Sequence, residues 1–417
     1  MKKNLAIVGS GISAMACAYY LRDDYNISIF EKNDYLGGHT HTHELSEEGK
    51  NFTIDTGFIV FNLETYKNLI NLFEELGVEK QKSNMSFSVY NKKNNLQYGS
   101  ASLVSMFAQK KNIFSPKYWR FLKEIQKFFK VALRDYKTIR GSEETIIEYC
   151  ERNGLSKFFI DNYLAPLSSA VWSTPHHDVY NFPISLLLPF FFNHGLLGIN
   201  AQHQWYTVRG GSNDYIKKIV EKGNFDVHLS EGAEEVIKSE QGVLLKTSRD
   251  EYNFDYVVLA SHSNESLEML KNLSPEKKGM LSKYDYNANR AVLHTDTSVM
   301  PPLKNTWSSW NNVIDEKDGE LISSTVYWMN NLQKPEAAKN YFVSINPFRE
   351  IDKNKIIKEI NYDHPNFTVE NFLLQEKLPK INENTRVLLA GAYFGYGFHE
   401  DGLKSGLAVV DILKNKI

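Results

Sequence analysis

The chain has 417 residues, of which 42% are hydrophobic and 24% charged, as in ordinary globular proteins of about two to three domains. Its formal net charge of −2 excludes a general binder of nucleic acids, although a local basic patch is still allowed. Two cysteines form no disulfide framework, so a reducing cytoplasm is the expected compartment. No stretch reaches the roughly 18 uninterrupted apolar residues of a transmembrane span.

The N-terminus carries the most specific motif. Residues 5–8 read as a strand, residues 9–14 (GSGISA) as a glycine turn, residues 14–21 as a helix, and residues 27–30 as a second strand ending at Glu31. This order is the dinucleotide-binding fingerprint, with alanine at its third small position. The alternatives are a glycine-rich turn without a ligand and a signal peptide. The signal peptide fails because the glycines interrupt the apolar stretch and no small-residue cleavage site follows.

Each position of the fingerprint has a mechanical reason. Gly9 allows the tight turn, and Gly11 leaves no Cβ between the backbone and a pyrophosphate. Ala14 permits close packing of helix on strand, and the helix N-terminus offers N–H groups to phosphates. Glu31 is expected to accept hydrogen bonds from ribose hydroxyls. The cofactor-binding residues predicted here are Gly9, Gly11, Ile12, Ser13, Ala14, Glu31 and Lys32.

Residues 36–43 read LGGHTHTH, so three histidines (39, 41 and 43) alternate and would share one face of a strand. Three histidines on one face could hold a metal. No carboxylate or cysteine partner stands at a fixed spacing, so no metal site is predicted. His39 and Thr40 are instead expected to line the cofactor.

Residues 115–134 form the clearest predicted helix, with Ser115 as its N-cap and Pro116 at its first position. Its apolar face is rich in phenylalanine, and its other positions are almost all basic, Glu124 being the only acid. This pattern is typical of contact with a membrane surface, expected here through residues 110–134. The alternative is a helix that simply covers a core.

Residues 181–199 are apolar but contain two prolines and two glycines, so they cannot span a bilayer. They could wall an acyl-sized tunnel, dip into a leaflet, or form the core of a helical cap. His194 in this segment is a candidate acid–base residue, although a lone histidine in an apolar wall is more often structural. Trp172 and Tyr327 are the other two candidate catalytic residues.

Short strands are expected at 225–229, 242–247 and 256–260, and a sheet-rich stretch covers residues 289–362. Residues 205–212 (WYTVRGGS) predict a return of the chain to the cofactor domain. Residues 385–407 predict a strand, an aromatic glycine loop and a final helix.

Together, residues 4–62, 205–261 and 385–410 resemble the FAD-binding parts of the flavin amine oxidase and phytoene desaturase superfamily. The resemblance implies FAD bound without a covalent link, since no cysteine lies in the C-terminal motif. It also implies that two glycines approach the diphosphate, that Gly57 and Phe58 lie at the flavin, and that a backbone valine binds the adenine edge. The cofactor-binding residues carried over are Gly37, Gly38, His39, Thr40, Gly57, Phe58, Val236, Ala260, Gly391, Ala392, His399, Asp401, Gly402 and Leu403.

The chain departs from the superfamily pattern at two positions. His39 replaces a basic residue, and Ala392 replaces the acid that usually holds the ribityl chain. His399, Glu400 and Asp401 are expected to take over part of that contact.

The predicted fold class is α/β, with a Rossmann-like FAD-binding domain of the second glutathione-reductase type and a discontinuous α+β substrate domain. The FAD-binding domain is expected at 1–62, 205–265 and 385–417. The substrate domain, a helical cap plus an antiparallel sheet, is expected at 63–204 and 266–384.

Motifs such as GGHTHT, FFFNHGLL and GAYFGYGFHEDGLKSGLA more closely resemble a bacterial family of predicted NAD/FAD-binding oxidoreductases. Its genes commonly stand beside cyclopropane-fatty-acid-synthase-like methyltransferases, which implies acyl-chain chemistry by association. The first hypothesis is an FAD-dependent oxidoreductase that desaturates, saturates or isomerises a lipid acyl chain by hydride transfer at flavin N5. The alternatives are an amine oxidase that releases peroxide and a non-enzymatic or electron-carrying flavoprotein.

Only one dinucleotide fingerprint is present, so the electron acceptor is expected to be oxygen, a quinone or another carrier. The expected ligand is a lipid or another apolar small molecule, with no nucleic acid partner. The expected location is the cytoplasm, with peripheral contact on the inner face of the membrane.

Overall fold

The computed structural model describes residues 2–198, 203–271 and 273–416. At its centre is a five-stranded parallel sheet that joins three distant parts of the chain. β1 and its two neighbours in the sheet, β2 and β14, are largely buried, as is usual for parallel strands that lie between layers. Its order is β10 (Asp226–His228), β2 (Tyr25–Phe30), β1 (Lys3–Val8), β14 (Tyr256–Leu259) and β20 (Val387–Leu389).

One face of this sheet packs against four helices that share a hydrophobic core. Gly406 allows two of them to approach closely, because a Cβ there would lie 2.6 Å from the Ser13 carbonyl oxygen. The helices are α1 (Ile12–Leu21), α2 (Lys67–Leu76), α9 (Asn213–Lys222) and α14 (His399–Lys414). Residues 67–76 therefore pack with the parallel sheet, although the sequence places them in the substrate domain.

The other face packs against a small antiparallel sheet and two short helices. Leu281 and Tyr284 are buried in this core, so residues beyond 265 also belong to the same layer. The elements are β11 (Ala233–Lys238), β12 (Val243–Thr247), β13 (Glu251–Phe254), α10 (Ser263–Met269) and α11 (Pro275–Leu281).

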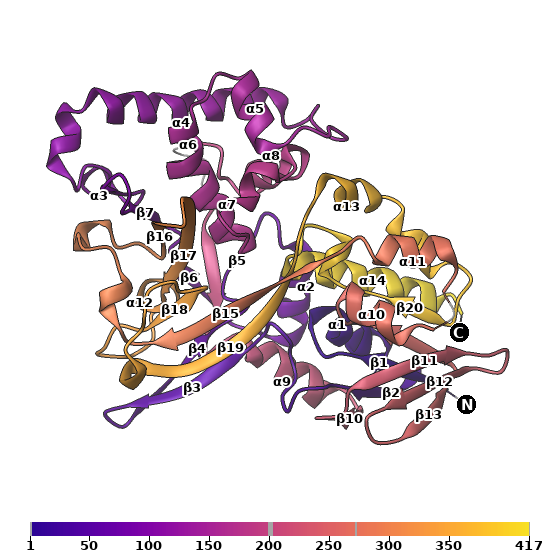
Figure 1. Cartoon of the computed structure of the whole chain (residues 1–417). Coiled ribbons are helices and arrows are strands. Elements are labelled where there is room, and N and C mark those ends of the chain that lie inside the picture. The colour runs from indigo at the N-terminus through magenta and orange to yellow at the C-terminus, as the bar shows by residue number, and fades with distance from the viewer. Residues whose placement is uncertain (1, 199–202, 272, 417) are drawn as a thin grey trace.

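A second large sheet of seven strands stands beside the first (Figure 1). Its pairings are antiparallel except that of β7 with β16, which is parallel. Its order is β19 (Ile356–Pro365), β15 (Tyr286–His294), β18 (Phe342–Ile345), β17 (Glu320–Trp328), β16 (Trp310–Lys317), β7 (Phe87–Asn91) and β8 (Leu96–Gly99).

Shorter elements connect these layers. Two small sheets pair β3 (Thr42–Glu47) with β4 (Lys50–Asp55), and β9 (Trp205–Val208) with β5 (Phe61–Asn62) and β6 (Lys80–Ser83). The helices α12 (Met329–Leu332) and α13 (Val369–Leu374) lie in the connections around the seven-stranded sheet.

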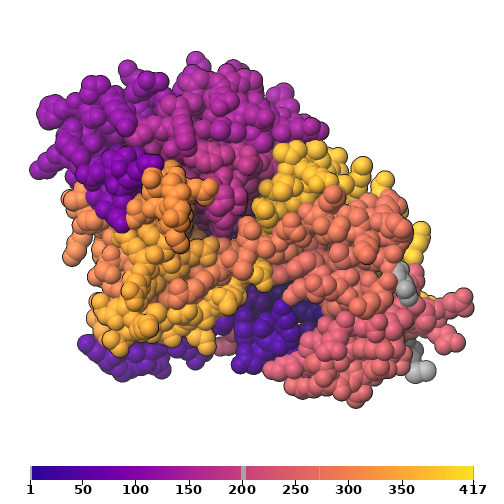
Figure 2. All heavy atoms as spheres, viewed as in Figure 1, coloured from indigo at the N-terminus to yellow at the C-terminus, as the bar shows by residue number. Residues whose placement is uncertain are grey.

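A helical cap covers one end of the molecule and appears purple to magenta in Figure 1 and in the space-filling view of Figure 2. Its longest helix starts as the sequence predicts, because the Ser115 side chain accepts a hydrogen bond from the Tyr118 N–H and Pro116 follows. The cap contains α3 (Leu103–Met106), α4 (Pro116–Asp135), α5 (Ile146–Arg152), α6 (Lys157–Phe159), α7 (Ala165–Trp172) and α8 (Ile184–Asn193).

The apolar segment 181–199 forms α8 over most of its length, and its last residue lies outside the described residues. Its leucines are buried in the cap core, so the helix does not dip into a leaflet. Phe190 and His194 also face the large cavity of the molecule. Within the described ranges, no helix is long and apolar enough to cross a bilayer.

Candidate active site

A cavity of about 1090 Å³ begins at the carboxyl ends of β1 and β2, where ligands of open parallel sheets bind. The Gly9 N–H donates to the Phe30 carbonyl oxygen at 2.8 Å, which closes the turn. Gly9 has φ of +94°, and a Cβ there would lie 2.9 Å from the Ala260 carbonyl oxygen. A Cβ on Gly11 would instead meet no atom within 4 Å. The first glycine is thus needed by the fold, and the second leaves open space.

The N-terminus of α1 faces this open space without a side-chain cap. Its first N–H groups therefore lack the partners that a helix normally finds at its start. Free N–H groups and the positive end of the helix dipole form an anion site, which suits a diphosphate.

Glu31 directly follows β2 and lies almost fully buried in the cavity wall. One carboxylate oxygen accepts a hydrogen bond from Ser10 Oγ at 2.6 Å, and the other accepts from the Asn33 N–H at 2.9 Å. Ser10 Oγ in turn accepts a hydrogen bond from the Gly37 N–H at 3.0 Å. Through Ser10, Glu31 therefore connects the turn at Gly9 to the glycine loop that begins at Gly37.

The second glycine loop brings His39 to the cavity. Its ring stacks on Tyr362 and His364, with centroids 4.9 Å and 5.2 Å away, and its Nε2 has no partner among the described residues. Burial lowers the pKa of His39 well below its usual value, so the ring is neutral. Gly57 must be a glycine here, since a Cβ would lie 2.2 Å from the His39 carbonyl oxygen.

Asp55, two residues before Gly57, holds this strand against the turn that the WYTVRGGS motif forms. Its carboxylate accepts hydrogen bonds from the Ser212 N–H at 3.0 Å and from Gln333 Nε2 at 2.6 Å. Burial raises the pKa of Asp55 to about 6. The carboxylate therefore has a structural role and connects the end of β4 to the glycine turn before α9 and to the residue after α12.

The C-terminal motif contributes His399, the first residue of α14, to the cavity lining. Its ring stacks on Phe58 with centroids 3.8 Å apart. Its Nε2 lies 2.8 Å from the Tyr215 hydroxyl and 3.1 Å from Thr40 Oγ1. Burial lowers the pKa of His399 to about 3, so this ring is also neutral near pH 7.

Most of the predicted cofactor residues line this cavity. They are Gly9, Gly11, Ile12, Ser13, Glu31, Lys32, Gly37, Gly38, His39, Gly57, Phe58, Ala260, Gly391, Ala392 and His399.

Six predicted residues lie behind the wall: Ala14, Thr40, Val236, Asp401, Gly402 and Leu403. Val236 is a residue of β11 whose side chain is buried in the core, whereas Ala233 and Glu234, at a bulge of the same strand, face the cavity. Asp401 accepts a hydrogen bond from the Phe398 N–H at 3.1 Å and so caps its own helix.

Glu400 is also turned away from the cavity. Its carboxylate accepts hydrogen bonds from the backbone N–H groups of Asn68 and Leu69, both at 3.0 Å, at the start of α2. Of the three residues expected to replace the missing acid, only His399 lines the cavity. The expectation for Glu400 and Asp401 is corrected because both carboxylates satisfy helix N-termini instead.

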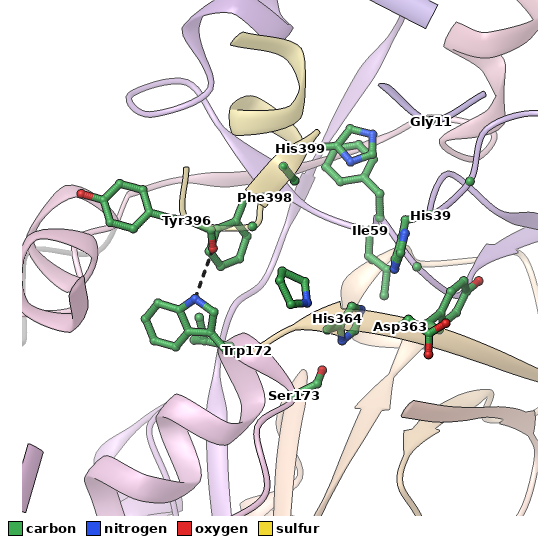
Figure 3. Close-up of a pocket in the computed structure, with 18 of the residues that line it drawn as sticks. Gly11, His39, Ile59, Trp172, Ser173, Asp363, His364, Tyr396, Phe398 and His399 are labelled. Carbon is green, nitrogen blue, oxygen red and sulfur yellow. Dashed lines mark hydrogen bonds between the residues drawn. The ribbon is translucent and has the colours of Figure 1, made fainter. Parts of the chain in front are cut away.

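The cavity continues from the sheet to the cap, where the three candidate catalytic residues Trp172, Tyr327 and His194 line it. Figure 3 shows Trp172 among the lining residues. Trp172 Nε1 donates to the Tyr396 carbonyl oxygen at 3.3 Å, and the Tyr327 hydroxyl donates to the Ala170 carbonyl oxygen at 3.3 Å. His194 Nδ1 lies 2.9 Å from the Phe190 carbonyl oxygen, so that nitrogen carries the proton. Burial lowers the pKa of His194 to about 4, which makes it a weak base.

Charge is distributed unevenly along the cavity. Its charged lining residues all lie on β11, α10 and β19 or directly after β2. They are Glu31, Lys32, Glu234, Glu265, Glu268 and Asp363. The lining contributed by residues 85–205 and 310–327 includes no charged side chain among the described residues. The cap half is apolar and aromatic, apart from a few neutral polar groups.

Sequence reasoning missed several lining residues, among them Tyr362, His364 and Phe398. Tyr362 and His364 alternate on β19, which is a signal for a shared face of a strand. Figure 3 shows His39, His364 and Asp363 on one side of the space and Trp172, Tyr396 and Phe398 on the other. Only the fold brings these two groups together. Within the described residues, no group of three or more potential ligands could hold a metal ion.

The open space at Gly11, the uncapped α1 and the unpartnered nitrogen of His39 fit a dinucleotide, and comparison with known proteins defines its class. The sequence profile of the family described as flavin containing amine oxidoreductase matches residues 12–360. The chain belongs to this family and is an FAD-dependent oxidoreductase. The predicted superfamily, fold class and cofactor are thereby confirmed.

Individual relatives are more distant. The 1-hydroxycarotenoid 3,4-desaturase of Flavobacterium sp. is 44% identical over 64 residues, which cover 15% of this chain and 12% of the relative. A putrescine oxidase variant has a TM-score of 0.72 at 13% identity, over 100% of this chain and 99% of the other. The fatty acid isomerase of P. acnes that produces CLA has a TM-score of 0.69 at 13% identity, over 99% and 98% of the two chains. These structural similarities establish the fold.

Proposed function

We propose that this enzyme desaturates, saturates or isomerises a lipid acyl chain with the help of bound FAD. The observation that carries the proposal is the cap half of the cavity, whose described lining is mainly apolar and aromatic and includes no charged side chain. An alkyl chain gains about 0.8 kcal/mol for each methylene group that leaves water for such a lining. A fatty acid isomerase and a 1-hydroxycarotenoid desaturase are among the similar proteins, which supports this proposal.

The sheet half of the cavity is proposed to hold the cofactor. Gly11 and the N-terminus of α1 would receive the diphosphate, and Glu31 would accept hydrogen bonds from the adenosine ribose. The backbone at Ala233 and Glu234 would meet the adenine edge, because this bulge, and not Val236, faces the cavity. Bound FAD supplies a two-electron acceptor or donor of hydride.

The chain's own residues would then position the reacting carbon and exclude water. Trp172 and Phe398 form an aromatic wall opposite His39 and His399, with the Trp172 and Phe398 rings 6.2 Å apart. Both histidines are held neutral by burial, so they bring no charge to an apolar substrate. A net desaturation also needs an electron acceptor, which we propose to be oxygen, a quinone or another carrier. A net saturation needs the reverse, a reduced carrier that delivers two electrons to the flavin. An isomerisation returns the hydride to the chain and needs none.

An amine oxidase is the second candidate, because family members with that activity share this fold and because aromatic rings surround the site. A diamine such as putrescine carries two positive charges in water, and burying them requires carboxylate partners. The described cap lining offers none. A hydrophobic monoamine that binds in its neutral form is the amine substrate that this cavity would accept.

The decisive experiment exposes the FAD-loaded enzyme to candidate substrates without oxygen. Saturated and unsaturated fatty acids and phospholipids are added in one series, and monoamines and diamines in another. Flavin absorbance and the mass and double-bond position of the acyl chains are followed. The proposal requires that acyl chains bleach or reoxidise the flavin or change the position of their double bonds. Bleaching by amines with peroxide release on readmission of air, and no response to any acyl chain, would replace it with the amine oxidase.

A further inference from the structure

Exposed apolar side chains gather at one corner of the cap. Among the described residues, nine large hydrophobic side chains are exposed, and five of them lie between positions 103 and 119. We call this group the cap corner. It consists of Leu103, Val104, Ile113, Phe114 and Trp119, of which Phe114 is 86% and Leu103 76% exposed. In Figure 1 this corner, at α3 and the start of α4, lies far from the parallel sheet.

The cap corner is held in place by hydrogen bonds behind it. Trp119 Nε1 donates to the Ile113 carbonyl oxygen at 2.8 Å, and the Tyr118 hydroxyl donates to the Met106 carbonyl oxygen at 2.7 Å. Gln109 accepts from the Gln97 N–H at 3.0 Å and so anchors the turn to β8. The apolar side chains are therefore presented outward by a packed scaffold.

The surroundings of the corner are strongly basic. Residues 100–130 contain seven lysines and arginines and a single acid, Glu124. That acid is buried, where it accepts hydrogen bonds from Ser156 Oγ and Arg120. The ion pairs of the described residues do not include Lys110, Lys111 or Lys123, so these charges are available to an anionic partner.

The apolar face of α4 that the sequence offered for membrane contact is not available. Phe121 and Phe128 on that face are buried in the cap core. Leu122, Ile125 and Phe129 line the cavity. Contact with a membrane would therefore have to use the exposed residues that precede and begin α4.

The cavity reaches the surface close to this corner. Ser100 and Gln126 line the cavity and are exposed to solvent. Met106 of α3 also lines the cavity and is half-buried. Met106 lies two residues from Val104 of the cap corner. Apolar anchors, lysines outside the ion pairs and an opening into the uncharged cap half of the cavity thus lie side by side on the cap.

We propose that the cap corner docks on the surface of an anionic lipid bilayer and that acyl chains pass from the bilayer into the cavity beside Met106. Exposed aromatic and aliphatic groups flanked by lysines are the features that interfacial anchors combine. The docking is independent of the reaction, whereas the passage of acyl chains rests on the proposed function.

Docking is tested by flotation of the FAD-loaded enzyme with vesicles of phosphatidylethanolamine and about 30% phosphatidylglycerol, compared with phosphatidylcholine alone. The double variant Leu103→Ser/Phe114→Ser should lower the bound fraction at least about tenfold. Ile357→Ser is the matched control, because Ile357 is 40% exposed on β19 outside the cap. Unchanged FAD content and melting temperature would show that the variants are folded.

The charges are tested in the same way. Lys110→Glu/Lys111→Glu should abolish the preference for anionic vesicles, and Lys353→Glu/Lys377→Glu, at exposed lysines elsewhere, should retain it. A wild-type enzyme that stays unbound, or corner variants that bind like the wild type, would overturn the docking. Self-association that disappears in Leu103→Ser/Phe114→Ser, without vesicle binding, would assign the corner to a second copy instead.

Passage of acyl chains is tested by comparing turnover of the same lipid in vesicles and in detergent micelles. Leu103→Ser/Phe114→Ser should lose turnover only with vesicles. Equal losses in both would overturn the passage. If no acyl lipid reacts in either form, the proposed function fails, whereas the docking is still decided by the flotation result.

Discussion

Replacing Gly11 with alanine tests whether the glycine turn at this position binds a cofactor or has only a structural role. The backbone of Gly11 has φ of −66° and ψ of 177°, a region that alanine adopts without strain. The added methyl group would meet no atom within 4 Å. The apoprotein should therefore fold, with a free energy of unfolding equal to that of the wild type or about 0.4–1 kcal/mol higher.

The same methyl group would project into the space that a diphosphate needs at the N-terminus of α1. A hydrogen bond to a charged group contributes about 1.5–3 kcal/mol, and we expect the variant to lose or lengthen at least one of them. At about 1.4 kcal/mol for each factor of ten, FAD should bind ten- to hundredfold more weakly. Titration of apoprotein with FAD, followed by flavin fluorescence, measures the affinity, and urea unfolding without FAD measures the stability.

Gly9→Ala serves as the control because it should show the opposite behaviour. Its φ of +94° and the 2.9 Å approach to the Ala260 carbonyl oxygen make a side chain costly in the fold itself, by about 1–3 kcal/mol. A Gly11→Ala variant that unfolds like the wild type and also binds FAD with wild-type affinity would refute the proposed position of the diphosphate.

Three further changes test other parts of the structure. Leu122→Trp should fill part of the cap half of the cavity and so shorten the longest acyl chain that the enzyme turns over. The control Leu133→Trp, at a position 44% exposed on the same helix, should leave that length unchanged. Turnover rates measured over a series of acyl-chain lengths test both expectations. Glu400→Ala removes the acceptor of two N–H groups at the start of α2 and should lower the free energy of unfolding in urea by about 1–3 kcal/mol, without weakening FAD binding. The pKa of His399 is about 3 in the folded state against 6.5 unfolded, so its contribution to stability is complete above pH 6.5 and is lost as the pH falls towards 3. The difference in unfolding free energy between the wild type and His399→Asn should therefore shrink by about 1.4 kcal/mol per pH unit in that window, and a constant difference would contradict the assignment.

The cofactor half of the molecule could be predicted from sequence because its signals are local. The β1–α1–β2 unit carries its strand, its glycines and its terminal acid within 31 consecutive residues. The start of α4 is similar, since Ser115 and Pro116 are sufficient to define a helix N-terminus. Such features require no knowledge of distant parts of the chain.

Positions that depend on register or on distant partners could not be predicted. A bulge between Ala233 and Glu235 shifts which residue of β11 faces the cavity, and the sequence has no mark for it. Glu400 stands in the C-terminal motif, yet its partners Asn68 and Leu69 lie more than 300 residues earlier. A carboxylate beside a motif is therefore weak evidence for a role in that motif.

The cap shows the same difficulty for apolar residues. Phe114 and Phe121 belong to one aromatic, basic segment, yet Phe114 is 86% exposed and Phe121 is buried. Helical periodicity describes one face of α4 but not what covers it, and here the core and the cavity cover it. Exposure of the preceding corner is a property of the tertiary structure.

The residues that looked catalytic illustrate why the reaction is harder to read than the cofactor. Trp172, Tyr327 and His194 all face the cavity, but each directs a polar atom to a backbone carbonyl oxygen, that of Tyr396, Ala170 or Phe190 respectively. None of them is paired with a carboxylate, so they form no acid–base dyad of the kind that tunes a proton-transfer residue. What the cap half contributes is shape, aromatic walls and the exclusion of charge. Selectivity in such a site depends on which molecules can leave water and enter the cavity. Substrate panels and the tests of acyl-chain passage at the cap corner therefore discriminate between the lipid and amine functions better than the removal of any one polar group does.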